Sequence, residues 1–205
     1  DGSLMAIKDG VAWTLLPFVE GGILGLDEDS VRSLGETQAR MHLIPVADCF
    51  PKSYRMGFEL FEEVISLSSK MGVSNPFVEM LSSRIAETKL DFPSDLPMGV
   101  LHGDLFPDNV IGGGGGVSAI LDLEEAWIGP MAFDIAMSCV GFGWDGTVPV
   151  WSRWKALFDG YQSVRKLSQK EVDCLPFLHQ FATLCIASWR FWKHNLREPD
   201  ELLSN

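Results

Sequence analysis

Three side chains in the middle of the chain, Asp104, Asn109 and Asp122, have the types and the order that phosphoryl transfer requires. That reaction needs a nucleophile aimed in line with the phosphorus and counter-charge around the phosphates, but little covalent chemistry from the protein. A carboxylate at position 104 could receive the proton of an attacking hydroxyl. Mg²⁺ prefers oxygen ligands and keeps several waters, so Asn109 and Asp122 could hold it together with phosphate oxygens. We therefore predict Asp104 as the catalytic base and Asn109 and Asp122 as metal ligands.

The segment from His102 to Asn109 has the spacing H-x-D-x-x-x-x-N of a kinase catalytic loop. A strand–turn–strand hairpin over 110–121 would fold the chain back and bring Asp122 to this loop. We expect His102 to be packed and to hold the loop by hydrogen bonds. Asp134 lies within an apolar helical stretch, where a buried acid needs partners. We expect the backbone N–H groups of the loop to be those partners.

The other charged residues near the motif have simpler interpretations. Glu124 could contact a second metal ion or support the site, and a solvated acid at a strand end is the equal alternative. We expect Asp108 to be a turn residue, Glu125 to be exposed, and Arg190 to pair with an internal carboxylate rather than with an acidic substrate. Three further histidines lack metal-ligand spacing, so structural roles are expected for them: His42, His179 and His194.

Composition restricts the class of protein. A chain of 205 residues with 46% hydrophobic and 21% charged residues is globular, and it suffices for one domain or for one domain and part of another. The net charge of −12 disfavours nucleic acid as a partner. No apolar run approaches the roughly 18 residues of a membrane span. Four cysteines without a C-x-x-C pair argue against structural zinc and indicate a reduced, cytoplasmic protein.

Periodicity and turn residues predict the elements. Strands are expected at 4–8 and 11–18 around Asp9-Gly10, followed by a turn at 19–22. Helices are expected at 28–43, at 58–71 and from Asn75-Pro76 onward. A strand at 98–101 precedes the motif, and strands at 110–111 and 117–121 flank five glycines, which we interpret as a hairpin tip rather than a phosphate cradle. Helices follow at 130–142, 149–164, and after a capping box at Ser168, with Pro176 ending one helix and beginning the next, to about Asn195.

The motifs resemble those of the aminoglycoside phosphotransferase and choline kinase superfamily, which has a protein-kinase-like fold. Within it the chain is most similar to the kinase-like homoserine kinases, through the segments 15–21, 35–42, 102–110 and 133–136. The resemblance implies an α+β fold: a mainly α-helical, protein-kinase-like C-terminal lobe with a short catalytic-loop β-hairpin, plus the last two strands of an N-terminal lobe. Residues 1–19 would be the remnant of that lobe and the hinge, and residues 20–205 the catalytic lobe.

The resemblance also implies ATP and Mg²⁺ as cofactors and a small-molecule hydroxyl acceptor, with homoserine favoured over an aminoglycoside- or choline-like amino alcohol. The hinge residues that would meet adenine are Pro17, Phe18, Val19 and Glu20. Only 14 residues precede Leu15, and they contain no glycine-rich loop and no lysine on the expected strand. Because the end at 199–205 also looks cut, we expect a fragment that is inactive alone.

Two other functions compete with this interpretation. A non-catalytic, kinase-derived binding module would explain the missing N-terminal lobe, although such a module need not keep Asp104, Asn109 and Asp122. A metal-dependent hydrolase could be built on His102, Asp104, Asp122 and Glu124, but the further histidine ligands common in such sites are missing.

Overall fold

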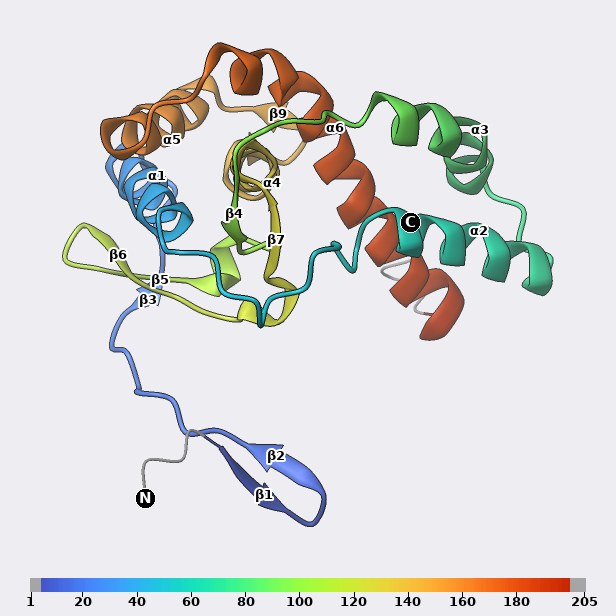
Figure 1. The fold of residues 1–205 in the computed structure, drawn as a ribbon, viewed down its shortest axis with the longest axis horizontal. Coiled ribbons are helices and arrows are strands. Elements are labelled where there is room, and N and C mark those ends of the chain that lie inside the picture. The colour runs from blue at the N-terminus through green and yellow to red at the C-terminus, as the bar shows by residue number, and fades with distance from the viewer. Residues whose placement is uncertain (1–4, 200–205) are drawn as a thin grey trace.

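The computed structural model of the chain describes residues 5–199, and its helices form two groups around a central pair (Figure 1). On one flank α1 and α5 lie side by side, and α2 and α3 lie on the other. The central pair is α4 and the long α6. The bounds are α1 Glu28–His42, α2 Phe58–Met71, α3 Pro76–Asp91, α4 Met131–Phe142, α5 Trp151–Val164 and α6 Gln169–Phe191. The helices predicted from periodicity at 28–43, 58–71, 130–142 and 149–164 are confirmed.

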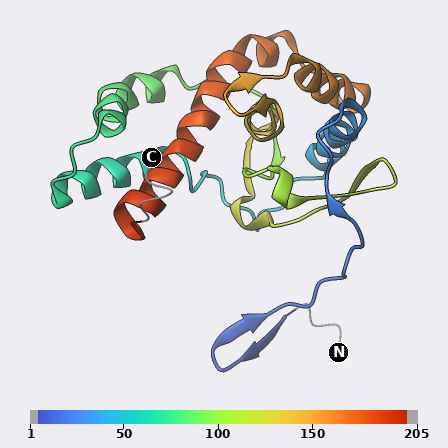
Figure 2. The ribbon, with the colours of Figure 1, turned by 180° about the vertical axis from the view of Figure 1, so that it is seen from behind.

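The strands form small antiparallel sheets. A three-stranded sheet has the order β3-β5-β6, from Gly22–Ile23, Val110–Gly113 and Gly116–Ile120. β4, Met98–Leu101, pairs with β7, Trp127–Pro130, and a short pair joins β8, Trp144–Asp145, to β9, Val148–Pro149. The first hairpin, β1 Ala6–Lys8 with β2 Val11–Trp13, stands away from the helical body (Figure 2). Gly114 and Gly115 have φ of 60° and 89° at the tip between β5 and β6, which confirms a hairpin tip there.

The hydrophobic core has two clusters, and α4 contributes to both. Phe133 packs in the cluster beneath α2 and α6, whereas Ile135 packs in the cluster beneath α1 and α5. A helix buried on most sides must be apolar around its circumference, which explains the nearly continuous apolar sequence of α4. Among residues 5–199, no helix is long and apolar enough to cross a membrane.

Two predicted boundaries are wrong. Pro176 lies inside one continuous helix, α6, rather than between two, and π-helical turns follow at Trp192–Arg197. Pro176 removes one backbone hydrogen bond, but the buried face continues past it through Leu178 and Phe181, and this packing holds the helix together. The second strand ends at Trp13 instead of residue 18, since the paired residues of β1 extend only over 6–8. The predictions for residue 4 and for the end at 200–205 lie outside the described residues.

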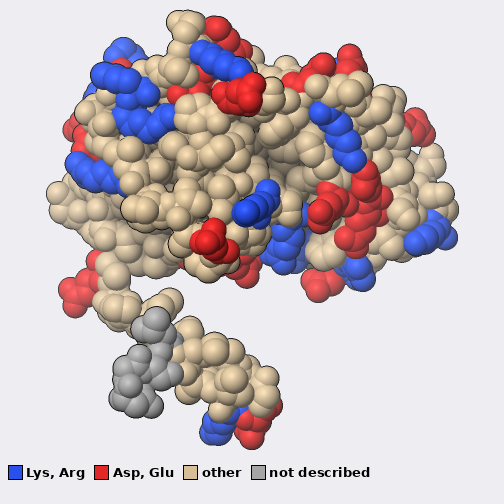
Figure 3. All heavy atoms as spheres, in the orientation of Figure 1, with Lys and Arg blue, Asp and Glu red and all other residues tan. Residues whose placement is uncertain are grey.

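The crossing of α1 and α5 depends on two glycines. A Cβ at Gly35 would collide with the carbonyl oxygen of Leu157, and a Cβ at Gly160 would collide with that of Arg32. The surface over these helices carries basic groups next to acidic ones (Figure 3). Arg32 of α1 and Asp159 of α5 also form an ion pair at 3.5 Å. Because exposed ion pairs contribute little, close backbone packing holds the crossing.

Replacing Gly160 by Ala in the complete protein is expected to lower the free energy of unfolding by about 1–3 kcal/mol, despite alanine's higher helix propensity. The added methyl group meets rigid backbone, so the helices must move apart. Urea unfolding followed by circular dichroism measures the change. Gly22→Ala is the control, because a Cβ there meets nothing within 4 Å. Equal stability of Gly160→Ala and the wild type would contradict the packing argument.

Candidate active site

The loop that follows β4 is held by a tight approach at Gly103. Its φ is 81°, and a Cβ there would lie 2.7 Å from the carbonyl oxygen of Glu125. The Tyr54 hydroxyl donates a hydrogen bond to the Gly103 carbonyl. Burial raises the pKa of Tyr54 well above its ordinary value, so this hydroxyl stays a donor. Glycine at position 103 is therefore required both by conformation and by space.

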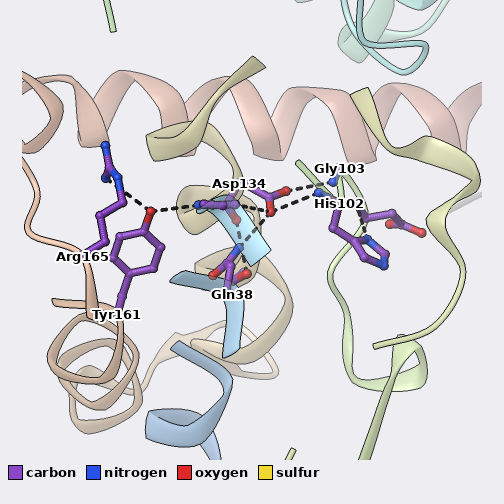
Figure 4. Close-up of polar contacts among 9 residues, drawn as sticks. Gln38, His102, Gly103, Asp134, Tyr161 and Arg165 are labelled. Carbon is purple, nitrogen blue, oxygen red and sulfur yellow. Dashed lines mark hydrogen bonds and ion pairs between the residues drawn. The ribbon is translucent and has the colours of Figure 1, made fainter. Parts of the chain in front are cut away.

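The carboxylate of Asp134 on α4 anchors the same loop through its backbone (Figure 4). It is fully buried and accepts hydrogen bonds from the backbone N–H groups of Gly103 at 2.8 Å and His102 at 3.2 Å. Two side chains of α1 also donate to it, Gln38 and His42, each at 3.0 Å. The predicted contact between Asp134 and the loop N–H groups is confirmed.

These donors keep Asp134 ionised. Burial raises the pKa of its carboxyl, but the hydrogen bond and charge of His42 and the N–H of Gly103 outweigh burial and lower the pKa to about 2. Neither Gln38 nor His42 was assigned to this site from the sequence. Their i, i+4 spacing, which places both on one face of α1, is the signal that could have found them.

The network continues from His42 across to α5 and α6. His42 Nδ1 lies within hydrogen-bond distance of the Tyr161 hydroxyl, at 2.8 Å, and the oxygen of this hydroxyl accepts a hydrogen bond from Arg165 at 3.3 Å. Arg165 in turn forms an ion pair at 2.8 Å with the buried Glu171 (Figure 4 shows Arg165, Tyr161 and Asp134). The carboxylate of Glu171 completes the capping box at Ser168, as predicted. One chain of polar contacts thus joins the loop to the first turn of α6.

His102 fastens the loop to the hairpin. Its side chain is fully buried, and its Nε2 donates to the carbonyl of Leu121 at 2.7 Å, while its Nδ1 accepts from the N–H of Asp104 at 3.2 Å. The N–H of Leu121 donates to the carbonyl of Asn109 at 2.8 Å. The β5–β6 hairpin therefore returns Asp122 next to the loop, as its position predicted. Asp122 adopts a left-handed conformation with φ of 59°, which is uncommon outside glycine.

The amide of Asn109 is oriented by Asp104. Its Nδ2 donates to the Asp104 carbonyl at 2.8 Å and to the Asp104 carboxylate at 3.3 Å. With the nitrogen committed to these bonds, the amide oxygen is the atom left for a cation. An amide oxygen and the carboxylate of Asp122 form an all-oxygen donor set, which fits Mg²⁺ in chemistry.

Asp104 lies at the wall of a cavity of about 240 Å³, which is also lined by Phe106, Trp189 and Arg190. Partial burial raises the pKa of the Asp104 carboxyl, and the negative charges of Asp108 and Asp122 add to this effect. A carboxylate with a raised pKa is a stronger proton acceptor than an exposed one. The cavity can thus place a hydroxyl group next to a base.

Two predictions about the neighbouring charges are wrong. Glu125 is buried rather than exposed, because Arg55 binds its carboxylate through two nitrogen atoms. Arg190 has no hydrogen bond or ion pair with any residue in 5–199, so the expected internal carboxylate partner is not found there.

The remaining predicted residues lie in exposed positions. Asp108 is in a 3-10 turn, Pro107–Asn109, and Glu124 is in another, Leu123–Glu125; both acids border the cavity. The residues proposed to meet adenine, 17–20, belong to an irregular segment between β2 and β3, where the side chain of Phe18 is 90% exposed. Within the described residues, no group of three or more His, Cys, Asp or Glu side chains is arranged to hold a metal ion.

The fold is that of a protein-kinase-like phosphotransferase, as predicted. An ethanolamine kinase of Plasmodium vivax superposes with a TM-score of 0.70 at 13% identity, covering 98% of this chain and 63% of that one. An amicoumacin kinase solved with AMP-PNP and Ca²⁺ gives a TM-score of 0.70 at 16% identity, covering 99% of this chain and 66% of that one. At these identities the likeness concerns the fold.

Sequence comparison adds the family. Residues 4–167 match the phosphotransferase enzyme family, and the chain belongs to this family. Similar curated proteins include homoserine kinases of Agrobacterium fabrum, 32% identical over 190 residues, and Brucella ovis, 34% identical over 196 residues. Each alignment covers 90% of this chain and 58% of the relative, so the chain spans less than two thirds of the length of these relatives.

The buried anion predicts a specific acid sensitivity. With a pKa of about 2 when folded and 3.8 when unfolded, Asp134 stabilises the fold fully above pH 3.8, and this contribution is lost as the pH falls through about 2. The difference in unfolding free energy between the wild type and Asp134→Asn should therefore shrink by about 2 kcal/mol over that window. Urea unfolding at a series of pH values measures it. Asp91→Asn, at the exposed end of α3, should follow the wild type. A pH-independent difference for Asp134→Asn would contradict the assignment.

Proposed function

We propose that the complete protein is an ATP- and Mg²⁺-dependent small-molecule kinase whose acceptor is homoserine. The observation that carries the proposal is the position of Asp104, a carboxylate with a raised pKa at the wall of a cavity, oriented by Asn109. Membership of the phosphotransferase family and similarity to proteins named homoserine kinase support it.

In this proposal Asp104 accepts the proton of the acceptor hydroxyl as the oxygen attacks the γ-phosphorus of ATP. A new oxygen–phosphorus bond forms, the bond between the γ-phosphorus and the β,γ-bridging oxygen breaks, and ADP leaves. The loop holds Asp104 in place through Gly103 and His102, whose N–H groups are fixed by Asp134. The acceptor hydroxyl would thus bind next to Asp104, whose backbone position is fixed by the loop.

Asn109 and Asp122 would hold Mg²⁺, which supplies counter-charge to the phosphate oxygens when bound. The segment Pro17–Glu20 would present its backbone groups to adenine. Residues 1–19 would comprise the remnant of the N-terminal lobe and the hinge, and the catalytic lobe would begin at residue 20. We place the reaction in the cytoplasm, in keeping with four cysteines that are all free thiols.

The size of the cavity favours a small acceptor. Its volume of about 240 Å³ lies below the roughly 300–1,000 Å³ of pockets that hold drug-sized ligands. A molecule as small as an amino acid suits this space better than an aminoglycoside does. The wall also contains Trp189 and Met56, which exclude water from one side of the bound acceptor.

Asp104→Asn should lower kcat by about 10²- to 10⁴-fold, because the amide cannot accept the hydroxyl proton. The measurement is ADP formation from Mg²⁺-ATP with homoserine, choline and an aminoglycoside, each offered separately to the complete protein. Asp91→Asn again serves as the matched control. Turnover that survives in Asp104→Asn, or turnover by the wild type on none of the acceptors, would refute the proposed function.

Asp122→Asn should raise the Mg²⁺ concentration needed for half-maximal activity. Loss of even an outer-shell partner weakens metal binding about 10- to 100-fold, so removal of a ligand charge should cost at least as much. Titration of ADP formation with Mg²⁺ measures the shift, and Mn²⁺ binding followed by electron paramagnetic resonance provides a readout independent of turnover. An unchanged metal requirement would remove Asp122 from the metal site.

A further inference from the structure

The cavity beside Asp104 contains one basic side chain among its lining residues, Arg190 near the end of α6. The acids of the lining are Asp104, Asp108, Glu124 and Glu125. Glu125 is neutralised by Arg55, and Asp104 is assigned to the hydroxyl. An uncommitted cation therefore faces the same small space as Asp108, which has no ion pair, and Glu124, whose carboxylate lies 3.9 Å from the guanidinium of Arg55.

The lack of a partner makes Arg190 unusual in this chain. The protein has a net charge of −12, so carboxylates are abundant. Even so, among the described arginines, only Arg84 and Arg190 have neither a hydrogen-bond nor an ion-pair partner for the guanidinium. Arg84 lies on the exposed side of α3 and does not line the cavity. Arg190 alone combines an open guanidinium with a place beside the proposed base.

We propose that Arg190 binds the carboxylate of the acceptor and so selects an amino acid over an amine that carries only a hydroxyl. This inference rests on the proposed function. A guanidinium presents a planar fork of N–H donors that matches a carboxylate in two parallel hydrogen bonds. Asp108 and Glu124 then receive the ammonium group of the same molecule. With the hydroxyl at Asp104, these contacts fix a short zwitterionic alcohol at both of its ends.

Apolar walls strengthen the interaction. Trp189 precedes Arg190 on α6, and Ile186 lies one helical turn before it; both line the cavity. Arg190 itself is exposed, so these walls limit the access of water only on the cavity side, where a bound carboxylate would meet the guanidinium. A site of this kind favours acceptors with a carboxylate over acceptors without one. An acceptor that lacks the carboxylate leaves the guanidinium unpaired in a site partly closed to water.

The test compares L-homoserine with 3-aminopropan-1-ol, which is homoserine with its carboxylate replaced by hydrogen. The complete protein is prepared as wild type, Arg190→Gln, Arg190→Lys and Arg84→Gln, the last being the matched control. Arg190→Gln should raise KM for homoserine by about 10- to 100-fold with little change in kcat, and should leave KM for 3-aminopropan-1-ol unchanged. Arg190→Lys should recover part of the loss, and Arg84→Gln should behave as wild type.

Calorimetric titration of both compounds into Asp104→Asn, with and without Arg190→Gln, separates this inference from the proposed function. If the wild type forms no ADP, the kinase proposal fails. Homoserine binding that depends on Arg190 would still support the carboxylate site. The inference is overturned if Arg190→Gln leaves homoserine binding unchanged, if it weakens both compounds equally, or if homoserine does not bind.

Discussion

The buried carboxylate of Asp134 is the constraint on which the candidate site depends. An ionised group with no exposure is tolerated only when donors surround it, and here four donors converge from α1 and from the loop after β4. Moving any one of the four would remove part of the hydrogen bonding that satisfies this buried charge. The relative positions of α1, α4 and the loop are therefore coupled. The backbone that leads into Asp104 is held in place by the same hydrogen bonds.

The polar network around this anion depends in turn on the close crossing of α1 and α5. Tyr161 follows Gly160, and the close approach at Gly160 brings the Tyr161 hydroxyl within 2.8 Å of His42. Burial raises the pKa of Tyr161 to about 12, so the hydroxyl remains protonated as it joins His42 to Arg165. The ion pair of Arg165 with Glu171 then fixes the first turn of α6. One end of α6 is thus tied to the network, while its other end carries Arg190 at the cavity.

Much of the site could be predicted from the sequence because many of its interactions join residues that are close together along the chain. The spacing from His102 to Asn109, the glycine tip of the hairpin and the capping box each involve residues a few positions apart. The partners of buried charges were missed because they come from distant elements: Gln38 lies 96 residues from Asp134, and Arg55 lies 70 residues from Glu125. Pro176 was misjudged for the opposite reason, since a local rule was overridden by packing along the whole of α6.

Acids of similar chemistry are given different roles by their surroundings. The hydrogen bonds and nearby charge lower the pKa of Asp134 more than burial raises it. Its pKa falls to about 2, so it serves as a permanent anion. Asp104 is partly buried beside other carboxylates, and its pKa rises, which suits a group that must take up a proton. Asp104 directly follows His102 and Gly103, whose N–H groups both donate to Asp134. Because Asp134 binds the loop backbone while the side chain of Asp104 borders the cavity, the structure can hold the loop with a fixed charge while leaving Asp104 free to titrate.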